Sequence, residues 1–212
     1  MKAFIKTGFI MLLISISPPA LAEIVEPKID LAEEKVELGP SVTAALRAWK
    51  LDFRLYKPED YMEPARATLE HTNRGLPMAL MGNFNGDGIA DIVLMGHTAD
   101  REIVVLVNSN KEKGKYEVFE VTNSPAVPNP RNLENNVGGA IYFGLDTYLS
   151  LVPANLFPAG PLVYANRGAE VASQIDRARD GFQIEVFLSA ATTSYVFDGK
   201  KVVPYTGRLK RI

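Results

Sequence analysis

The sequence contains no cysteine, two histidines and one tryptophan among its 212 residues. Without cysteine there is no disulfide, no thiolate metal ligand and no lipidated N-terminal cysteine. With only His71 and His97, a histidine-rich metal site and an HExxH motif are excluded. The chain also lacks a Gly-x-Ser-x-Gly elbow and a phosphate-binding Gly-x-x-x-x-Gly-Lys loop. The usual signatures of serine hydrolases and of P-loop nucleotide-binding proteins are therefore missing.

Long apolar runs are missing as well. The mostly apolar stretch Phe9–Ile16 is shorter than the roughly 20 residues that span a bilayer as a helix. Lys2 and Lys6 precede it, and the small residues of Ala20-Leu21-Ala22 follow it. This order predicts a secretory signal peptide over residues 1–22 that is cleaved after its last residue. We therefore expect a periplasmic or secreted protein with no transmembrane segment after cleavage; the alternative is an uncleaved N-terminal anchor.

Basic residues are slightly outnumbered. Removing the signal peptide lowers Lys+Arg from 23 to 21 against 25 Asp+Glu, so the net charge becomes −4. This mild acidity argues against nucleic acid or an anionic membrane as the main partner. Residues 23–39 carry most of their charge as acids and predict an acidic tether, with a short helix over 30–36 as the alternative. Residues 40–212 are expected to form a single, mostly β domain.

The N-terminal part of this domain has helical spacing. Pro40 and Ser41 predict a helix start, because proline is tolerated in the first turn. Apolar residues recur at near-helical intervals, at Val42, Leu46 and Trp49. We expect this helix to end by Leu55-Tyr56, and a second short helix to lie within residues 59–70.

From residue 76 onward the pattern changes to strands. The short apolar or alternating runs are 78–81, 92–95, 102–107, 116–121, 140–143, 148–152, 162–164, 182–188 and 193–197. Asp198-Gly199 predicts a tight hairpin turn that leads into 202–203. The proline- and asparagine-rich stretch 122–139 is expected to be a long irregular loop. Together these patterns predict an α+β fold, mainly antiparallel β with one or two N-terminal helices.

One motif points to chemistry. Between two predicted strands, side-chain oxygens stand at alternate positions, at Asn83, Asn85 and Asp87, and again at Asp91. The main-chain carbonyl of Ile89 adds a further oxygen. Calcium is a hard cation that takes six to eight oxygen ligands, and alternating ligands allow a tight loop to surround one ion. Gly88, after the third ligand, permits the sharp turn that such a loop needs.

The loop is not an EF-hand, because the twelfth position counted from Asn83 is Leu94 and not a bidentate glutamate. Residues 78–107 instead resemble the calcium loop of FG-GAP and VCBS-type repeats, with matches at Gly82, Phe84, Asn85, Gly86, Asp87, Gly88 and Asp91. That resemblance implies a strand–loop–strand unit, as found in integrin-like β-propellers and in many exported bacterial proteins, and a bound Ca²⁺. The sequence departs from the family at Asn83, where aspartate is usual.

Two charged ligands predict weak calcium binding, on the order of 10⁻⁴–10⁻³ M, and a structural rather than a catalytic ion. A metal-free Asn-Gly-Asp-Gly turn is the alternative. A single repeat does not close a propeller. We therefore expect the unit to lie in a smaller sheet or sandwich, and not in a complete β-propeller; an incomplete propeller completed by a partner chain is the alternative.

These features favour an exported noncatalytic binding or interaction module with a structural calcium loop. Its partner would be an extracellular or periplasmic protein or a glycan. The alternative is a carboxylate-dependent hydrolase acting on cell-wall or polysaccharide substrates, which needs two carboxylates facing each other about 5–10 Å apart. Asp176 with Asp180, and Glu117 with Glu120, are the acid pairs considered for that role.

Overall fold

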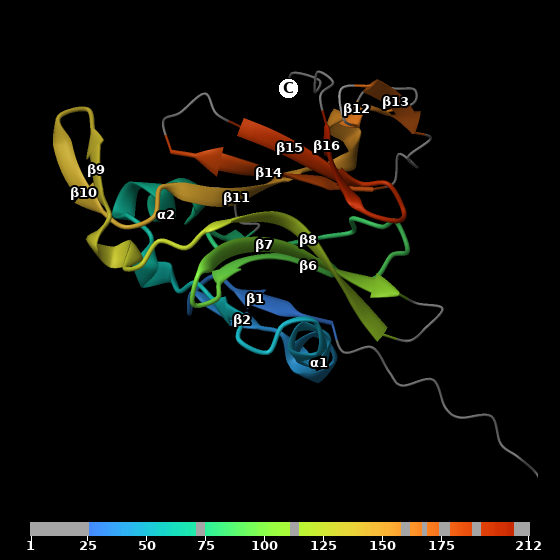
Figure 1. The fold of residues 1–212 in the computed structure, drawn as a ribbon, viewed down its shortest axis with the longest axis horizontal. Helices are drawn as coiled ribbons and strands as arrows, with labels where there is room; N and C mark the ends of the chain where they lie inside the picture. Colours follow the sequence, from blue (N-terminus) through green and yellow to red (C-terminus); the bar gives the residue numbers. More distant parts are fainter. Residues whose placement is uncertain are drawn as a thin grey trace, which may run out of the picture.

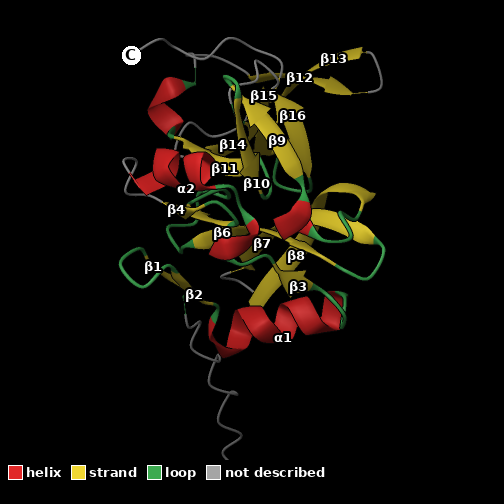
Figure 2. Cartoon of the chain, turned by 90° about the vertical axis from the view of Figure 1, so that its left-hand side faces the viewer, coloured by secondary structure: helices red, strands yellow, loops and turns green. Residues whose placement is uncertain are grey.

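Two antiparallel sheets lie face to face, and one helix covers the outer face of the first sheet (Figure 1, Figure 2). The computed structural model describes residues 26–70, 75–110, 115–157, 162–166, 169–173, 179–187 and 192–205. The predicted signal peptide, residues 1–22, lies outside the described residues.

The first sheet contains the predicted meander. Its strands are β4 (Gly75–Leu76), β5 (Ala79–Gly82), β6 (Asp91–His97), β7 (Arg101–Asn110) and β8 (Lys115–Pro125), paired in that order, with β3 (Arg54–Leu55) added against β6. Strand β6 is buried on both faces, as its unbroken apolar sequence requires. A bulge between Val104 and Val105 shifts the register of β7 on β8.

The second sheet comes from the C-terminal part of the chain. Its strands are β11 (Thr147–Val152), β14 (Gly181–Val186), β15 (Thr192–Phe197), β16 (Val202–Tyr205), β12 (Leu162–Asn166) and β13 (Ala169–Ser173), again paired in that order. The predicted Asp198-Gly199 turn joins β15 to β16: Asp198 Oδ1 accepts hydrogen bonds from the N–H groups of Lys200 and Lys201, and Gly199 has φ +98°.

Helix α1 (Gly39–Trp49) starts where it was predicted, with Pro40 in the first turn, and buries Val42 and Leu46. It ends at Trp49, before the latest end predicted at Leu55-Tyr56. Lys50 is already extended, and Arg54 and Leu55 pair with β6. Pairing with a central strand stabilises the extended backbone there, which overrides the local helical spacing.

The tether prediction was wrong, as was the helix alternative. Residues 28–37 form a hairpin of β1 (Lys28–Asp30) and β2 (Lys35–Glu37), and Ile29 and Val36 pack against the main core. An Asx turn shapes the hairpin, because Asp30 Oδ1 accepts hydrogen bonds from the N–H groups of Ala32 and Glu33, both at 3.0 Å.

The predicted loop over 122–139 is partly ordered as strand. Strand β8 continues to Pro125, and a 3₁₀ turn η2 (Pro130–Asn132) leads to a separate hairpin of β9 (Glu134–Val137) and β10 (Ala140–Phe143) that projects from the sandwich (Figure 1). The predicted second helix is present as η1 (Pro58–Asp60) and α2 (Glu63–Glu70), and η3 (Ala154–Leu156) follows β11.

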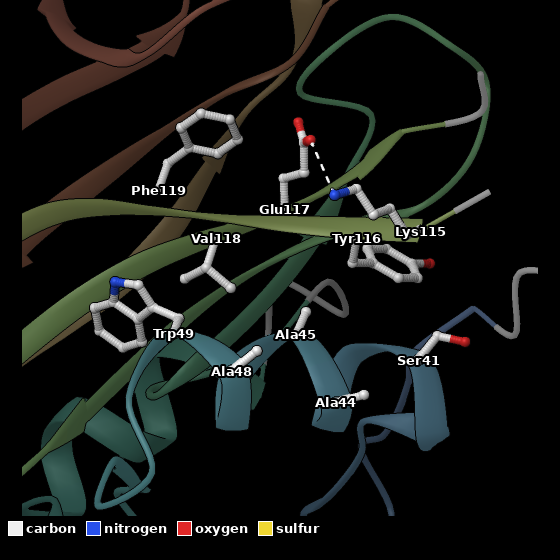
Figure 3. A pocket seen from close by; sticks show the side chains of 10 residues that line it. All are labelled: Ser41, Ala44, Ala45, Ala48, Trp49, Lys115, Tyr116, Glu117, Val118 and Phe119. Carbon is white, nitrogen blue, oxygen red and sulfur yellow. Dashed lines mark ion pairs between the residues drawn. The ribbon is translucent and has the colours of Figure 1, made fainter. Parts of the chain in front are cut away.

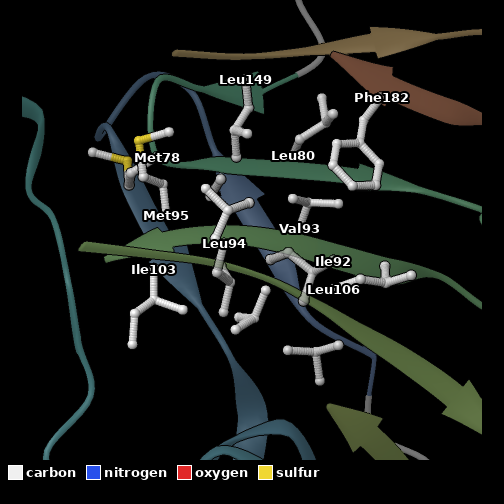
Figure 4. Packing of buried hydrophobic residues seen from close by; sticks show 14 of the residues in the cluster. Met78, Leu80, Ile92, Val93, Leu94, Met95, Ile103, Leu106, Leu149 and Phe182 are labelled. Atoms are coloured by element: carbon white, nitrogen blue, oxygen red, sulfur yellow. The ribbon is translucent and has the colours of Figure 1, made fainter. Parts of the chain in front are cut away.

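The main core fills the space between the two sheets and beneath α1. Figure 4 shows Leu149 and Phe182 of the second sheet pointing toward Leu80 and Val93 of the first. The mainly antiparallel β class with an N-terminal-side helix is confirmed. Within the described residues neither sheet closes on itself, so the fold is not a complete propeller. Of the helices in this part of the chain, none is long and apolar enough to span a bilayer.

Candidate functional site

The loop between β5 and β6 has the shape that its glycines predict. Gly86 and Gly88 have φ +79° and +82°, in the left-handed region where a Cβ is strained. The turn expected at Gly88 is therefore present. Gly88 also has open space around its Cβ position, so backbone conformation, and not crowding, is what requires glycine there.

The first three candidate ligands turn their side-chain oxygens toward the N–H groups of the loop itself. Asn83 Oδ1 accepts hydrogen bonds from Gly86 N–H at 2.9 Å and Gly88 N–H at 3.4 Å. Asn85 Oδ1 accepts from Asp87 N–H, and Asp87 Oδ1 accepts from Ile89 N–H, each at 2.8 Å. The sequence thus builds a chain of Asx turns along the loop.

Asp91 is the fourth candidate side chain, and it is completely buried. Its Oδ2 accepts hydrogen bonds from the N–H groups of Phe84 and Asn85, at 2.8 and 3.2 Å. Its Oδ1 accepts from the N–H and the hydroxyl of Ser109, at 2.7 and 2.8 Å. Burial raises the pKa of Asp91 to about 6, although these hydrogen bonds act to lower it.

Ser109 and Asn108, at the end of β7, complete the site and were not found by sequence reasoning. The Ser109 hydroxyl lies 2.9 Å from Asp87 Oδ2, and Asn85 Nδ2 donates to the Ser109 carbonyl at 2.7 Å. With its amide oriented to satisfy its neighbours, Asn108 Nδ2 donates to both oxygens of Asp91. No signal near the motif in sequence indicates these residues, because strand pairing alone brings β7 beside the loop.

The donor set suits a hard cation. Asn85 Oδ1 and Asp87 Oδ1 each accept one hydrogen bond and keep a lone pair for an ion, whereas Asn83 Oδ1 and both oxygens of Asp91 each accept two. The carbonyl of Ile89 would add a further oxygen, the kind of ligand that calcium prefers. In the part of the chain that the structure describes, no lysine or arginine forms an ion pair with Asp91. The same part contains no cluster of three or more His, Cys, Asp or Glu, so a cation here would depend largely on neutral oxygens.

The loop also joins the two sheets. Asp180, just before β14, accepts a hydrogen bond from Asn83 N–H at 3.1 Å and one from Ala154 N–H at 3.0 Å, and its own N–H donates to the Asn83 carbonyl at 3.0 Å. Phe84 is fully buried and packs edge-to-face on Phe182, with ring centroids 5.6 Å apart. A change in this loop is therefore transmitted to the contact between the sheets.

A polar groove of about 500 Å³ opens beside the loop. Its lining includes Asp87 and Ser109, the β8 residues Glu117 and Phe119, Arg179, and the β15–β16 turn at Gly199 and Lys200. Figure 3 shows Glu117 and Phe119 pointing to the side of β8 opposite α1. The groove therefore lies on the side of β8 that faces the second sheet.

A larger hollow of about 690 Å³ lies on the other side of β8, against α1 (Figure 3). Small side chains of the helix leave it open, at Ser41, Ala44, Ala45 and Ala48. Trp49 closes one end and packs on Phe53, as a core aromatic does. Among the described residues, the polar groups that line this hollow are the Ser41 side chain, the Tyr116 hydroxyl and the Lys115–Glu117 pair, 3.8 Å apart.

The acid pairs considered for hydrolysis do not form a facing pair in the described residues. Asp180 is bonded to the loop, and Asp176 lies outside the described residues. Glu117 and Glu120 are three residues apart on one strand, so their side chains project from opposite faces of the sheet.

A second polar cluster lies at the far end of β6. The Tyr56 hydroxyl donates to Glu102 Oε2 at 3.1 Å, and the Tyr56 ring stacks on His97 with centroids 5.0 Å apart. His97 Nδ1 lies 3.0 Å from the Thr98 carbonyl, which accepts the Nδ1 proton. Burial raises the pKa of Glu102; the bond from Tyr56 lowers it and nearby Asp146 raises it.

Replacing Glu102 by glutamine should remove a pH dependence of stability. A carboxyl whose pKa is higher in the folded than in the unfolded protein stabilises fully below its unfolded pKa, near 4.3, and this contribution is lost as pH rises through the folded pKa. Glutamine keeps an acceptor for Tyr56 without the charge. The variant and the wild type should therefore melt alike at pH 4, and the variant should melt at a higher temperature than the wild type at pH 7. A constant difference across this range would contradict the assignment.

Comparison with known proteins gives no match: no protein family, curated relative or solved structure corresponds to this chain.

Proposed function

We infer that this chain is an exported, noncatalytic binding module in which the 83–91 loop is a structural calcium site. The loop's oxygen donors and its glycine conformations support this inference, as does the resemblance of its sequence to FG-GAP and VCBS loops. Export rests on the signal-peptide pattern of residues 1–22. When calcium is bound, the ion contributes positive charge and cross-links the loop; it activates no water and no substrate in this proposal.

The observation that carries the proposal is the buried carboxylate of Asp91 at the junction of the two sheets. Asp91 is surrounded by N–H and O–H donors but has no ion-pair partner among the described residues. A buried carboxylate costs free energy unless it is paired or bound to a metal. The Ser109 hydroxyl lies within hydrogen-bond distance of both Asp91 and Asp87. Asp87 would therefore supply the second negative charge of a cation site.

Calcium should stabilise the protein by a measurable amount. With a dissociation constant of about 0.1 mM, roughly 1 mM calcium adds about 1.4 kcal/mol to the free energy of unfolding. For a chain of this size that raises the melting temperature by about 3–6 °C. Thermal melts followed by Trp49 fluorescence, in EDTA and in calcium, measure the shift. Asp87→Ala should abolish it.

Asp30→Ala is the matched control, because Asp30 forms an equivalent Asx turn in the β1–β2 hairpin, away from the loop. Both variants lose an Asx turn and melt somewhat lower in EDTA, but Asp30→Ala should keep the full calcium shift. If the wild type does not respond to calcium, or if Asp87→Ala responds as well as the wild type, the loop is a metal-free turn and the calcium proposal fails.

A further inference from the structure

We propose that the groove beside the loop binds a saccharide that carries one carboxylate per unit, a uronic-acid type of sugar. This rests on the proposed function, since it names the ligand class that the module would take. The groove's volume of about 500 Å³ lies within the usual range of small-ligand sites, about 300–1,000 Å³.

Arg179 supplies the reason for an anion. Its side chain lies across the loop, with Cγ and Nε 3.0 and 3.2 Å from the position that a Cβ on Gly86 would occupy. Nη1 donates only a long hydrogen bond, 3.4 Å, to the Phe197 carbonyl, and Nε is buried without an acceptor among the described residues. A guanidinium has five donors in a planar fork that matches a carboxylate. The described residues satisfy this fork poorly, and exposed Lys200 adds a second positive charge at the rim.

The acidic side chains restrict which anion fits. Asp87 and Glu117 line the same groove, so a densely charged polyanion would be repelled. Asp87 Oδ1 accepts a hydrogen bond from Ile89 N–H at 2.8 Å, and Glu117 Oε2 accepts one from Asn110 Nδ2 at 3.2 Å. The second oxygen of Asp87 is an acceptor for a hydroxyl group. A ligand that combines one carboxylate with several hydroxyls uses both kinds of group.

Phe119 gives the groove an apolar wall. It is half-buried and packs against Phe197 with ring centroids 4.9 Å apart, which fixes the ring beside the polar residues. The negative face of an aromatic ring attracts the C–H groups of a sugar ring. The lining residues Glu117 and Phe119 point from one face of β8 (Figure 3), so the groove does not follow the edge of β8, where an added peptide strand would pair. The lining therefore favours a saccharide over an extended peptide.

An NMR titration of the ¹⁵N-labelled protein in EDTA tests the proposal. The probes are disaccharides of glucuronate, galacturonate and mannuronate, each beside its neutral counterpart with a hydroxymethyl group. At least one acidic probe should bind and shift the signals of Ser109, Gly199 and Arg179 Nε. Its affinity should exceed that of the neutral counterpart by about tenfold or more, as one charge-assisted hydrogen-bond pair gives. EDTA excludes calcium bridging by the sugar.

Variants separate recognition from folding. Arg179→Met should lose the preference for the acidic probe, and Arg179→Lys should restore part of it. Lys200→Met, at an exposed position that leaves folding intact, should weaken only the acidic probe, by about threefold. Arg101→Met, an exposed arginine at the opposite end of β7, is the matched control and should bind as the wild type does.

The proposal is overturned if no acidic probe binds, or if acidic and neutral probes bind equally. It is also overturned if Arg179→Met binds the acidic probe as well as the wild type does. Binding of an acidic dipeptide or inorganic phosphate at these residues, with the same affinity as the acidic saccharide, would overturn it too. Because the titration contains no calcium, its failure leaves the calcium-dependent melt unaffected. Failure of the calcium melt alone would leave the saccharide site standing.

Discussion

Replacing Asp91 by alanine is expected to lower the free energy of unfolding by about 2–4 kcal/mol at pH 7 in EDTA. The change removes the acceptor of two buried N–H groups, at Ser109 and Phe84, of the half-buried Asn85 N–H, and of the Ser109 hydroxyl. Each buried donor left unpaired costs about 1–3 kcal/mol. A second effect opposes this loss. Burial raises the pKa of Asp91 to about 6, so keeping this carboxyl ionised at pH 7 costs the wild-type protein about 3 kcal/mol of stability. The alanine variant does not carry that cost.

The sign of the pH dependence provides a further check. Because the folded pKa of Asp91 is raised, its contribution to stability is fully present below the unfolded value near 3.9 and is lost as pH rises through about 6. Alanine should therefore cost more at pH 5 than at pH 7. Guanidinium denaturation at both pH values measures this. Asp91→Asn keeps an oxygen acceptor without the charge and should cost less at pH 7. If alanine costs nothing at either pH, water satisfies the donors and the hydrogen-bonded frame is dispensable.

The sequence predicted the first sheet and the shape of the loop because both depend on local signals. The runs at 78–81 and 92–95 became β5 and β6, and Gly88 has the left-handed conformation that the motif required. Turn chemistry and apolar runs are properties of a few neighbouring residues. The same holds for the start of α1 at Pro40.

The features that the sequence did not predict depend on contacts between distant residues. Ser109 bonds to Asp91 across 18 residues of sequence, and Asp180 bonds to Asn83 across 97 residues. Strand pairing and sheet stacking bring them there, and no pattern near the motif signals either one. The β1–β2 hairpin is similar: its three-residue strands are too short to give an alternating pattern, and packing of Ile29 and Val36 on the core stabilises them.

Gly96 explains why α1 stops early. A Cβ at this position in β6 would lie 2.2 Å from the Arg54 carbonyl and 2.6 Å from the Phe53 ring. Glycine thus allows β3 and Phe53 to approach the central strand closely. The chain after α1 gains a backbone ladder and the burial of Phe53 and Tyr56 by leaving the helix. Helical spacing in the sequence takes no account of the partner strand β6, whose pairing with Arg54 and Leu55 decides the conformation here.

Replacing Phe84 by alanine is expected to cost about 3–5 kcal/mol, which lowers the melting temperature by roughly 6–20 °C. Its ring is fully buried against Phe182, which in turn stacks on Tyr195 with centroids 5.4 Å apart. Alanine leaves a cavity between the two sheets that tightly packed strands on both sides cannot fill. Phe143→Ala is the matched control, because Phe143 on β10 is 58% exposed and should change stability by less than about 0.5 kcal/mol.

The calcium response of Phe84→Ala shows whether the Phe84 ring fixes the loop in place or only fills the core. The Phe84 N–H binds Asp91 and the Phe84 ring is held by the second sheet, so the ring fixes the loop backbone to which the carboxylate is bonded. Without the ring, calcium must order the loop as well as bind it, and its affinity should fall. The melting-temperature shift in 1 mM calcium should therefore be smaller in Phe84→Ala than in Phe84→Leu, which keeps most of the apolar contact. Equal shifts in both variants would show that the loop holds its shape through its Asx turns alone.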